Sequence, residues 1–221
     1  MNEQADKLDF AGCAGDVEGL GPGKRTVMWV RGCSLACPGC MTPELWAVGS
    51  PMNFTSVERV AELLRPLLKK ADGLTISGGE PMEQPAALTS LIRLLRAENA
   101  NLEVLVYSGY SLEALMKRGQ IVTGFLEEID ILIDQPFLKA APNTLKWRGS
   151  DNQRVHYLSS NAQIYASDDD NAPKERPIQI QRMGIGQFRL VGIPKRGDIE
   201  RYRQMMEQRG FRIEKFGSGS Q

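Results

Sequence analysis

The feature that most constrains the fold is an alternation of short apolar segments with amphipathic ones between residues 26 and 134. The apolar segments have the length of β-strands and end in turn-forming residues, whereas the segments between them have helical spacing. The expected strands are Thr26–Val30, Leu74–Ser77, Leu102–Tyr107 and Ile129–Ile133, and the expected helices begin near Thr55, at Pro85 and at Leu112. This alternation predicts an α/β fold with a parallel sheet. Because the strands are short and too few to close an eight-stranded barrel, we expect an open, partial (β/α) barrel.

The remainder of the chain gives weaker signals, and we expect it to form a C-terminal extension of about residues 157–216 on a core of about residues 21–156. Residues 1–216 are thus expected to form a single domain, with a flexible tail at 217–221. Gln163–Glu175 contains three consecutive aspartates and a proline, which is typical of a solvated, mobile loop. The other expected elements are a hairpin of Ile178–Ile180 with Phe188–Val191 across Gly184–Gly186, a helix capped by Asp198 that stops before Gly210, and a strand at Phe211–Ile213.

Composition limits the classes of function that the chain can have. The 27 basic residues balance the 27 acidic ones, so net charge gives no argument for binding nucleic acid or a membrane surface. The sequence contains no run of 18 apolar residues, so no membrane span is expected. Residues 1–9 lack the apolar stretch of a signal peptide. Four cysteines, three of them clustered, fit a reducing compartment, so the cytoplasm is the expected location.

Cys33, Cys37 and Cys40 form a C-x3-C-x2-C motif directly after the first expected strand. Three thiolates in one loop cannot all pair as disulfides, but they can hold an iron–sulfur cluster in which one position lacks a protein ligand. A zinc site is the alternative, with Cys13 or His156 as its fourth ligand, although structural zinc sites usually contain two C-x2-C pairs. Cys13 is more simply a free thiol, and His156 is more simply a strand or loop residue.

Three more polar segments follow expected strands: Gly78-Gly79-Glu80-Pro81, Ser108-Gly109 and Asp134. Because the carboxyl ends of parallel strands meet at one edge of a sheet, we expect these segments to form one active site with the cysteine loop. The two glycines allow close approach of the backbone to a ligand, and Glu80 can receive an ammonium group.

Three of the candidate residues have a structural alternative. Ser108 could serve a ribose or a carboxylate, and Asp134 a ribose or an amino group, or both residues could simply end their strands. Arg148 could bind a carboxylate or a substrate backbone, although the polar residues around it are more typical of a surface loop.

The cysteine motif and the Gly-Gly-Glu-Pro segment together resemble the signature of the radical S-adenosylmethionine (SAM) enzymes. Longer segments resemble, more narrowly, the activating proteins of anaerobic (class III) ribonucleotide reductase and their stand-alone relatives: Trp29–Cys40, Glu44–Trp46, Tyr107–Tyr110, Ile129–Phe137 and Trp147–Gln153. The similarity covers about Gly21 to His156. Met41 and Gln135 depart from the pattern of that branch, which affects the identity of the substrate rather than of the cofactor.

The resemblance implies a [4Fe-4S] cluster bound by the three cysteines and SAM bound through the fourth iron, with Gly78–Pro81 at the SAM amino group. It also implies an electron donor of the flavodoxin or ferredoxin type and reductive cleavage of SAM to a 5′-deoxyadenosyl radical. In the activating proteins that radical takes a hydrogen from a glycine Cα of a large partner. Two alternatives remain open, namely a radical SAM enzyme that modifies a peptide or small molecule, and a non-catalytic module stabilised by metal.

Overall fold

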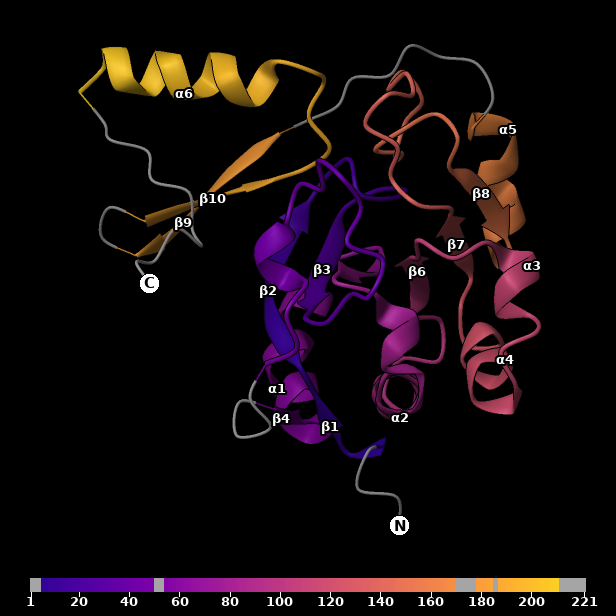
Figure 1. The fold of residues 1–221 in the computed structure, drawn as a ribbon. Helices are drawn as coiled ribbons and strands as arrows, with labels where there is room; N and C mark the ends of the chain where they lie inside the picture. Colours follow the sequence, from indigo (N-terminus) through magenta and orange to yellow (C-terminus); the bar gives the residue numbers. More distant parts are fainter. Residues whose placement is uncertain (1–4, 50–53, 170–177, 185–186, 211–221) are drawn as a thin grey trace.

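A six-stranded mixed sheet forms the centre of the molecule, in the strand order β2-β3-β5-β6-β7-β8 (Figure 1). The computed structural model describes residues 5–49, 54–169, 178–184 and 187–210. The strands of this sheet are β2 (Phe10–Val17), β3 (Arg25–Val30), β5 (Gly73–Gly78), β6 (Glu103–Tyr107), β7 (Ile131–Asp134) and β8 (Arg154–Tyr157). The four central strands β3, β5, β6 and β7 run parallel, whereas β2 and β8 pair antiparallel at the two edges.

The prediction of an α/β fold with a mainly parallel sheet is confirmed, because the four expected strands are the four parallel ones. Each of them matches its expected position to within two residues at either end. The edge strands β2 and β8 were not expected from the sequence. Two further strands, β1 (Lys7–Leu8) and β4 (Thr55–Ser56), pair antiparallel in a small separate sheet.

The helices between the parallel strands begin close to where the sequence predicts them. Helix α1 (Val57–Leu68) starts two residues after Thr55, because the hydroxyl of Ser56 accepts a hydrogen bond from the Arg59 amide and caps it. Helices α2 (Pro85–Arg96) and α3 (Leu112–Leu115) begin at the expected residues. Helix α4 (Gln120–Leu126) was not expected. None of the helices in the described ranges has the length and apolar character needed to cross a membrane.

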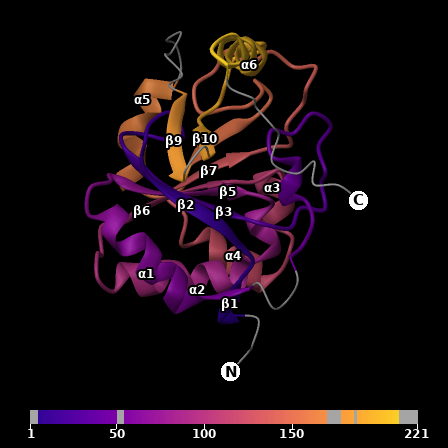
Figure 2. The same cartoon turned by 90° about the vertical axis from the view of Figure 1, so that its left-hand side faces the viewer.

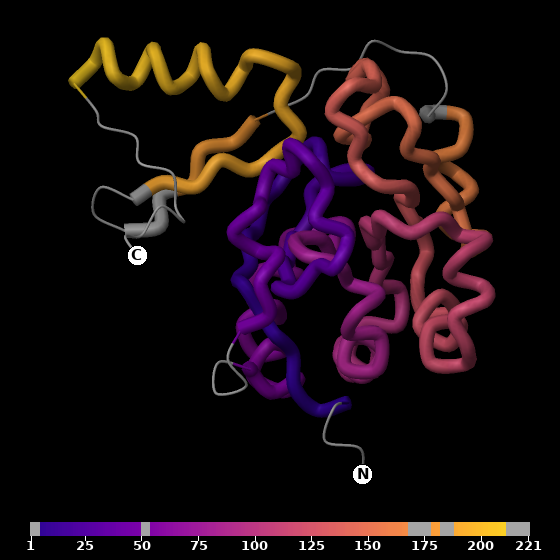
Figure 3. Tube along the Cα trace, in the orientation of Figure 1, coloured from indigo at the N-terminus to yellow at the C-terminus, as the bar shows by residue number. Residues whose placement is uncertain are grey.

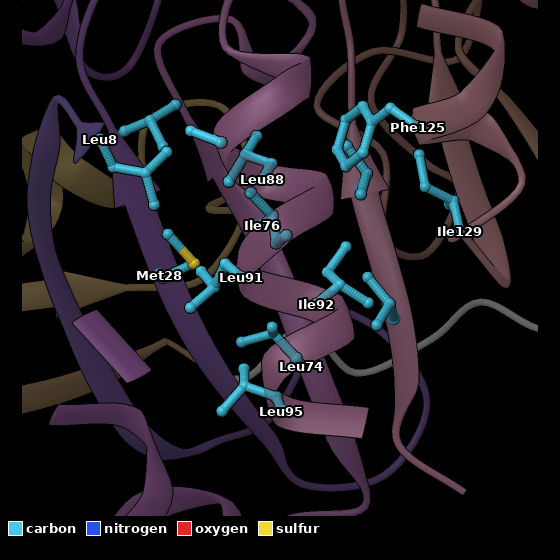
Figure 4. Packing of buried hydrophobic residues seen from close by; sticks show 14 of the residues in the cluster. Leu8, Met28, Leu74, Ile76, Leu88, Leu91, Ile92, Leu95, Phe125 and Ile129 are labelled. Carbon is cyan, nitrogen blue, oxygen red and sulfur yellow. The ribbon is translucent and has the colours of Figure 1, made fainter. Parts of the chain in front are cut away.

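The main hydrophobic core lies between the sheet and helices α1, α2 and α4, which cover the same face (Figure 2). Figure 4 shows α2 packed over β3 and β5, with Leu88, Leu91 and Ile92 fully buried. Each fully buried leucine or isoleucine contributes about 1.5–3 kcal/mol. This packing fixes the relative positions of the strands and therefore of the loops that follow them.

The opposite face of the sheet is covered by the C-terminal extension. Strands β9 (Gln179–Gly184) and β10 (Gln187–Val191) pair antiparallel, which confirms the expected hairpin, although its turn lies partly outside the described residues. Val191 is buried against Val17 and Val27 of the central sheet. Figure 2 shows this hairpin and helix α6 on the side of the sheet away from α1 and α2.

Two expectations for the extension need correction. The expected loop from Gln163 is wrong as far as residue 169, where a 3-10 helix (η5, Asn161–Tyr165) and α5 (Ala166–Asp169) form because Ala162 is buried against the sheet. Helix α6 (Asp198–Gln208) ends before Gly210 as expected, but Gly197 is its N-cap and Asp198 its first residue. Residues 170–175, the expected strand Phe211–Ile213 and the tail at 217–221 lie outside the described residues.

Candidate functional site

The cysteine loop and the Gly-Gly-Glu-Pro segment are in direct backbone contact. The amide of Gly79 donates to the carbonyl of Val30 over 2.7 Å, and the amide of Glu80 donates to the carbonyl of Gly32 over 2.7 Å. These bonds continue the parallel pairing of β3 with β5 beyond the ends of both strands. Two motifs that are about 40 residues apart in the sequence therefore form one structural unit.

The two glycines are required by this contact. Gly78 has a φ of +108°, and a Cβ there would lie 2.5 Å from the Val30 carbonyl oxygen. A Cβ on Gly79 would overlap the carbonyl oxygen of Gly32. The sequence suggested that these glycines let the backbone approach a ligand. The structure shows that Gly78 lets it approach the end of β3 and Gly79 the backbone of residues 31–32, so a side chain at either position would displace the chain that leads into the cysteine loop.

Neighbouring backbone groups hold the cysteine loop in place. The amide of Gly32 donates to the Leu45 carbonyl over 2.9 Å, and the amide of Cys33 donates to the Trp46 carbonyl over 3.0 Å. A turn closes the C-terminal half of the loop, because the amide of Cys40 donates to the Cys37 carbonyl over 3.0 Å. The loop is therefore ordered by the chain itself.

The three cysteines of the motif are free, half-buried thiols. Burial raises the pKa of Cys33 and of Cys37, while backbone amides that donate to each sulfur lower it. The backbone amide of Phe137 lowers the pKa of Cys37, and the amide of Thr42 donates to the sulfur of Cys40 over 3.5 Å. N–H donors around sulfur stabilise a thiolate and are a usual feature of iron–sulfur sites.

The donor set fits an iron–sulfur cluster. Three thiols with amide donors around their sulfur atoms are soft ligands of the kind that such clusters use. In the described ranges no three His, Cys, Asp or Glu side chains are arranged to hold a single metal ion. A cluster does not require that arrangement, because each thiolate binds a different iron atom.

Glu80 connects the end of β5 to the end of β6. Its side chain is 1% exposed. It accepts hydrogen bonds from the hydroxyl of Ser108 at 2.9 Å, the amide of Gly109 at 2.8 Å and the amide of Met82 at 3.0 Å. Burial raises the pKa of Glu80 to about 7, although the three donors oppose the increase. A cation beside this carboxylate would favour its ionised form.

A second acidic residue at this rim was missed by sequence reasoning. Glu83 accepts hydrogen bonds from the amide and from the hydroxyl of Ser34, at 2.8 and 2.5 Å, both through the same carboxylate oxygen. The Ser34 hydroxyl also lies 3.1 Å from the Tyr110 hydroxyl. Because Ser34 follows Cys33 directly, Glu83 fixes the start of the cysteine loop. In the sequence, the only feature that pointed to Glu83 as a site residue was its position three residues after Glu80.

Asp134 ends β7, as expected, and its carboxylate has several partners. Arg154 donates to it at 2.6 Å, the amide of Leu112 donates to it at 2.7 Å, and Nε2 of His156 lies 3.0 Å away. Burial acts to raise the pKa of Asp134, but the donors outweigh it and leave the pKa below its ordinary value. These contacts favour the strand-ending role of Asp134 that the sequence left open.

The two candidate fourth ligands lie on opposite edge strands of the sheet. Cys13 is in β2, where it pairs with Met28. His156 is in β8, where it pairs with Leu132, so it is a strand residue as the sequence favoured. Among the described residues, the side chain of Cys13 lies near Arg189 and that of His156 lies near Asp134.

The expectation that Arg148 lies in a surface loop is wrong. Trp147, Arg148 and Ser150 are all buried. The hydroxyl of Tyr107 donates to the carbonyl of Trp147 over 2.8 Å, which holds this segment at the end of β6. Burial raises the pKa of Tyr107, and the positive charge of Arg148 opposes that increase, so the guanidinium lies within electrostatic reach of the same strand end.

Comparison with known proteins identifies similar chains. The model of the family described as "4Fe-4S single cluster domain" matches residues 19–156. The anaerobic ribonucleoside-triphosphate reductase-activating protein of Escherichia coli K12 is 33% identical over 143 residues, which cover 62% of this chain and 91% of that protein. The protein of the same name from Haemophilus influenzae is 33% identical over 141 residues (62% and 89% covered), and that from bacteriophage T4 is 32% identical over 138 residues (61% and 85%).

Among solved structures, QueE from Escherichia coli aligns with a TM-score of 0.39 at 17% identity, covering 57% of this chain and 68% of QueE. The family match ends at His156, so η5, α5, the β9–β10 hairpin and α6 all lie beyond it.

Proposed function

The chain belongs to the 4Fe-4S single-cluster domain family, and on that premise we propose that it is a radical SAM activating enzyme. Cys33, Cys37 and Cys40 would bind three irons of a [4Fe-4S] cluster and leave the fourth for SAM. The observation that carries the proposal is the hydrogen bond from Glu80 to Gly32, which joins the Gly-Gly-Glu-Pro segment to the cysteine loop. Bound together, the two cofactors supply a 5′-deoxyadenosyl radical after one-electron reduction.

The remaining site residues would bind and orient SAM. Gly78–Pro81 lies against the cysteine loop and is assigned to the SAM amino group, whose positive charge would favour ionised Glu80. Ser108 and Gly109 hold the Glu80 carboxylate in place. We assign the SAM carboxylate to Arg148 and a supporting role to Asp134, which holds Arg154 and the start of α3.

The substrate that we propose is a glycine Cα of an anaerobic ribonucleotide reductase, from which the enzyme removes a hydrogen atom. This assignment rests on the names of relatives whose length is almost fully covered. The electron would come from a donor of the flavodoxin or ferredoxin type. A different peptide or small-molecule substrate is the second candidate, because the extension lies beyond the region shared with those relatives.

The wider architecture is part of the same proposal. We propose that the open sheet is a partial (β/α) barrel, that residues 1–216 form a single domain with a core of about 21–156, and that residues 217–221 are a flexible tail. A cluster held by half-buried thiolates requires a reducing environment, which favours the cytoplasm.

The first prediction tests the function directly. Reconstituted anaerobically with iron and sulfide, then reduced with dithionite in the presence of SAM, the protein should form 5′-deoxyadenosine. Cys37→Ala should reduce the product to the background level, whereas Cys13→Ala, which changes a thiol outside the motif, should leave it unchanged. Product is measured by liquid chromatography.

Two results would contradict the proposal: a wild-type protein that takes up no iron, or product formation that does not depend on Cys37. Mixing the loaded enzyme with anaerobic ribonucleotide reductase then separates the two substrate candidates. A glycyl radical signal in electron paramagnetic resonance supports the reductase, and its absence despite 5′-deoxyadenosine formation supports another substrate.

A further inference from the structure

The C-terminal extension is attached at one end to the edge strand β2. The side chain of Gln179 donates to the Asp16 carbonyl over 2.7 Å, and that of Gln181 donates to the Gly15 carbonyl over 3.0 Å. The guanidinium of Arg189 lies over the ring of Trp29, 4.7 Å from its centre. Figure 3 shows the hairpin alongside the first strands of the chain. The extension is therefore anchored to the sheet by several independent contacts.

The extension is attached at a second point to the loop that follows β7. Nη2 of Arg196 donates to the carbonyls of Lys139 and Ala141, and the second of these bonds is 2.6 Å long. The side chain of Asn143 donates to the carbonyl of Pro194 over 3.3 Å. Since β2 is one edge of the sheet and β7 lies next to the other edge, the extension bridges the two sides of the open sheet.

The same loop after β7 rests on the cysteine loop. A Cβ on Gly39 would lie 2.8 Å from Cδ of Lys139, so the lysine side chain packs directly over the glycine that precedes Cys40. Two residues before Lys139, the backbone amide of Phe137 lies near enough to the sulfur of Cys37 to lower the pKa of that thiol. The loop thus contacts the metal-binding turn through both a side chain and a backbone amide.

We propose that Arg196 is a positioning residue of the cluster site. By holding the carbonyls of Lys139 and Ala141, it keeps the loop of residues 137–141 on the cysteine turn and aims the Phe137 amide at Cys37. This inference rests on the proposed function, because it assigns a role toward the cluster. On this proposal, the C-terminal extension, which lies beyond the family match, sets the stability and the reduction potential of the cluster. Hydrogen bonds to cluster sulfur tune that potential.

The test compares Arg196→Ala with Arg196→Lys and with Arg209→Ala, an exposed arginine just past the far end of α6. In Arg196→Ala, chelators should remove iron from the cluster about tenfold faster than from the wild type, in the range found when outer contacts of metal sites are lost. Its midpoint potential should become more negative, because the backbone N–H of Phe137 moves away from the cluster sulfur. Arg196→Lys, which keeps a charged donor, should restore part of both changes, and Arg209→Ala should match the wild type.

Hydrogen exchange provides a readout without any cofactor. In the iron-free protein, amides of residues 137–141 should exchange about tenfold faster in Arg196→Ala, while those of β5 and β6 should be unchanged, which also shows that the variant is folded. Equal exchange, iron loss and potential in Arg196→Ala and wild type would overturn the inference alone. A wild type that takes up no iron would overturn the proposed function and the inference with it.

Discussion

At the scale of single residues, the site depends on a buried carboxylate that connects two strand ends. Glu80 accepts three hydrogen bonds from protein groups yet has a pKa of about 7, because burial outweighs those donors. Ionised Glu80 therefore carries a free-energy cost in the cofactor-free protein. The amino group of SAM would offset that cost, which couples the charge of this residue to cofactor binding.

This cost predicts a pH dependence of folding. Since the folded pKa of about 7 exceeds the ordinary value of 4.5, the native state binds more protons between these values, and stability falls as pH rises through that window. Relative to Glu80→Gln, the wild type should lose about 3 kcal/mol of unfolding free energy between pH 4.5 and 7. Urea titrations at several pH values measure this loss of unfolding free energy, and Glu62→Gln, at an exposed glutamate, is the control. If the unfolding free energies of the wild type and Glu80→Gln change with pH in parallel, the raised pKa assigned to Glu80 is refuted.

At the scale of elements, the central feature is the close approach of the chain after β5 to the chain after β3. Gly78 and Gly79 allow that approach, because a Cβ at either position would overlap backbone atoms of residues 30–32. The pairing of the two strands continues into the cysteine loop through backbone hydrogen bonds. The position of the metal-binding turn is therefore set by sheet geometry as well as by the loop itself.

Gly79→Ala should accordingly damage both the fold and the site. The methyl group would displace the backbone of Gly32, and we expect a loss of about 1–3 kcal/mol of unfolding free energy together with reduced iron uptake. Gly124→Ala is the matched control. Its Cβ meets nothing within 4 Å and it lies inside α4, so it should gain up to about 1 kcal/mol. Urea unfolding measures the stability of both variants, and iron analysis measures their iron uptake. Wild-type stability and iron uptake in Gly79→Ala would contradict the close approach of Gly79 to the Gly32 backbone.

At the scale of the whole molecule, the two ends of the sheet have separate roles. The carboxyl ends of the strands bear the candidate site, whereas the amino ends are closed by a fully buried Arg25. Its guanidinium donates to Glu103 over 2.6 Å and to the carbonyl of Leu74 over 2.8 Å. Tyr165 of the extension also bonds to Glu103, so the extension contributes to this end as well.

Breaking this pair should lower stability without changing the chemistry. Glu103→Ala leaves a buried cation without its partner and should cost about 3–5 kcal/mol. The double variant Arg25→Met/Glu103→Ala removes both charges and should be more stable than Glu103→Ala alone. Chemical denaturation measures both, and 5′-deoxyadenosine formation per folded molecule should remain at the wild-type level. If the double variant is less stable than Glu103→Ala, the unpaired charge of Arg25 is not the cause of the lost stability.

Local patterns in the sequence were sufficient for the parallel strands, the starts of α2 and α3, and the C-terminal hairpin. Strand and helix periodicity is carried by neighbouring residues, so it can be interpreted without knowing the fold. The cysteine motif and the Gly-Gly-Glu-Pro segment were visible for the same reason. Their meeting at one edge followed from the rule that parallel strands end together, and the structure places them in contact.

The tertiary structure alone decided which residues support those motifs. Edge strand β8, the inward position of Arg148 and the bonds from Ser34 to Glu83 depend on residues that are distant in sequence. The same holds for Arg196, which reaches a loop 55 residues away. No local pattern records such contacts, because they arise only when the sheet brings separate loops to one rim. The sequence by itself thus determined the type of chemistry, whereas packing determined which side chains hold it in place.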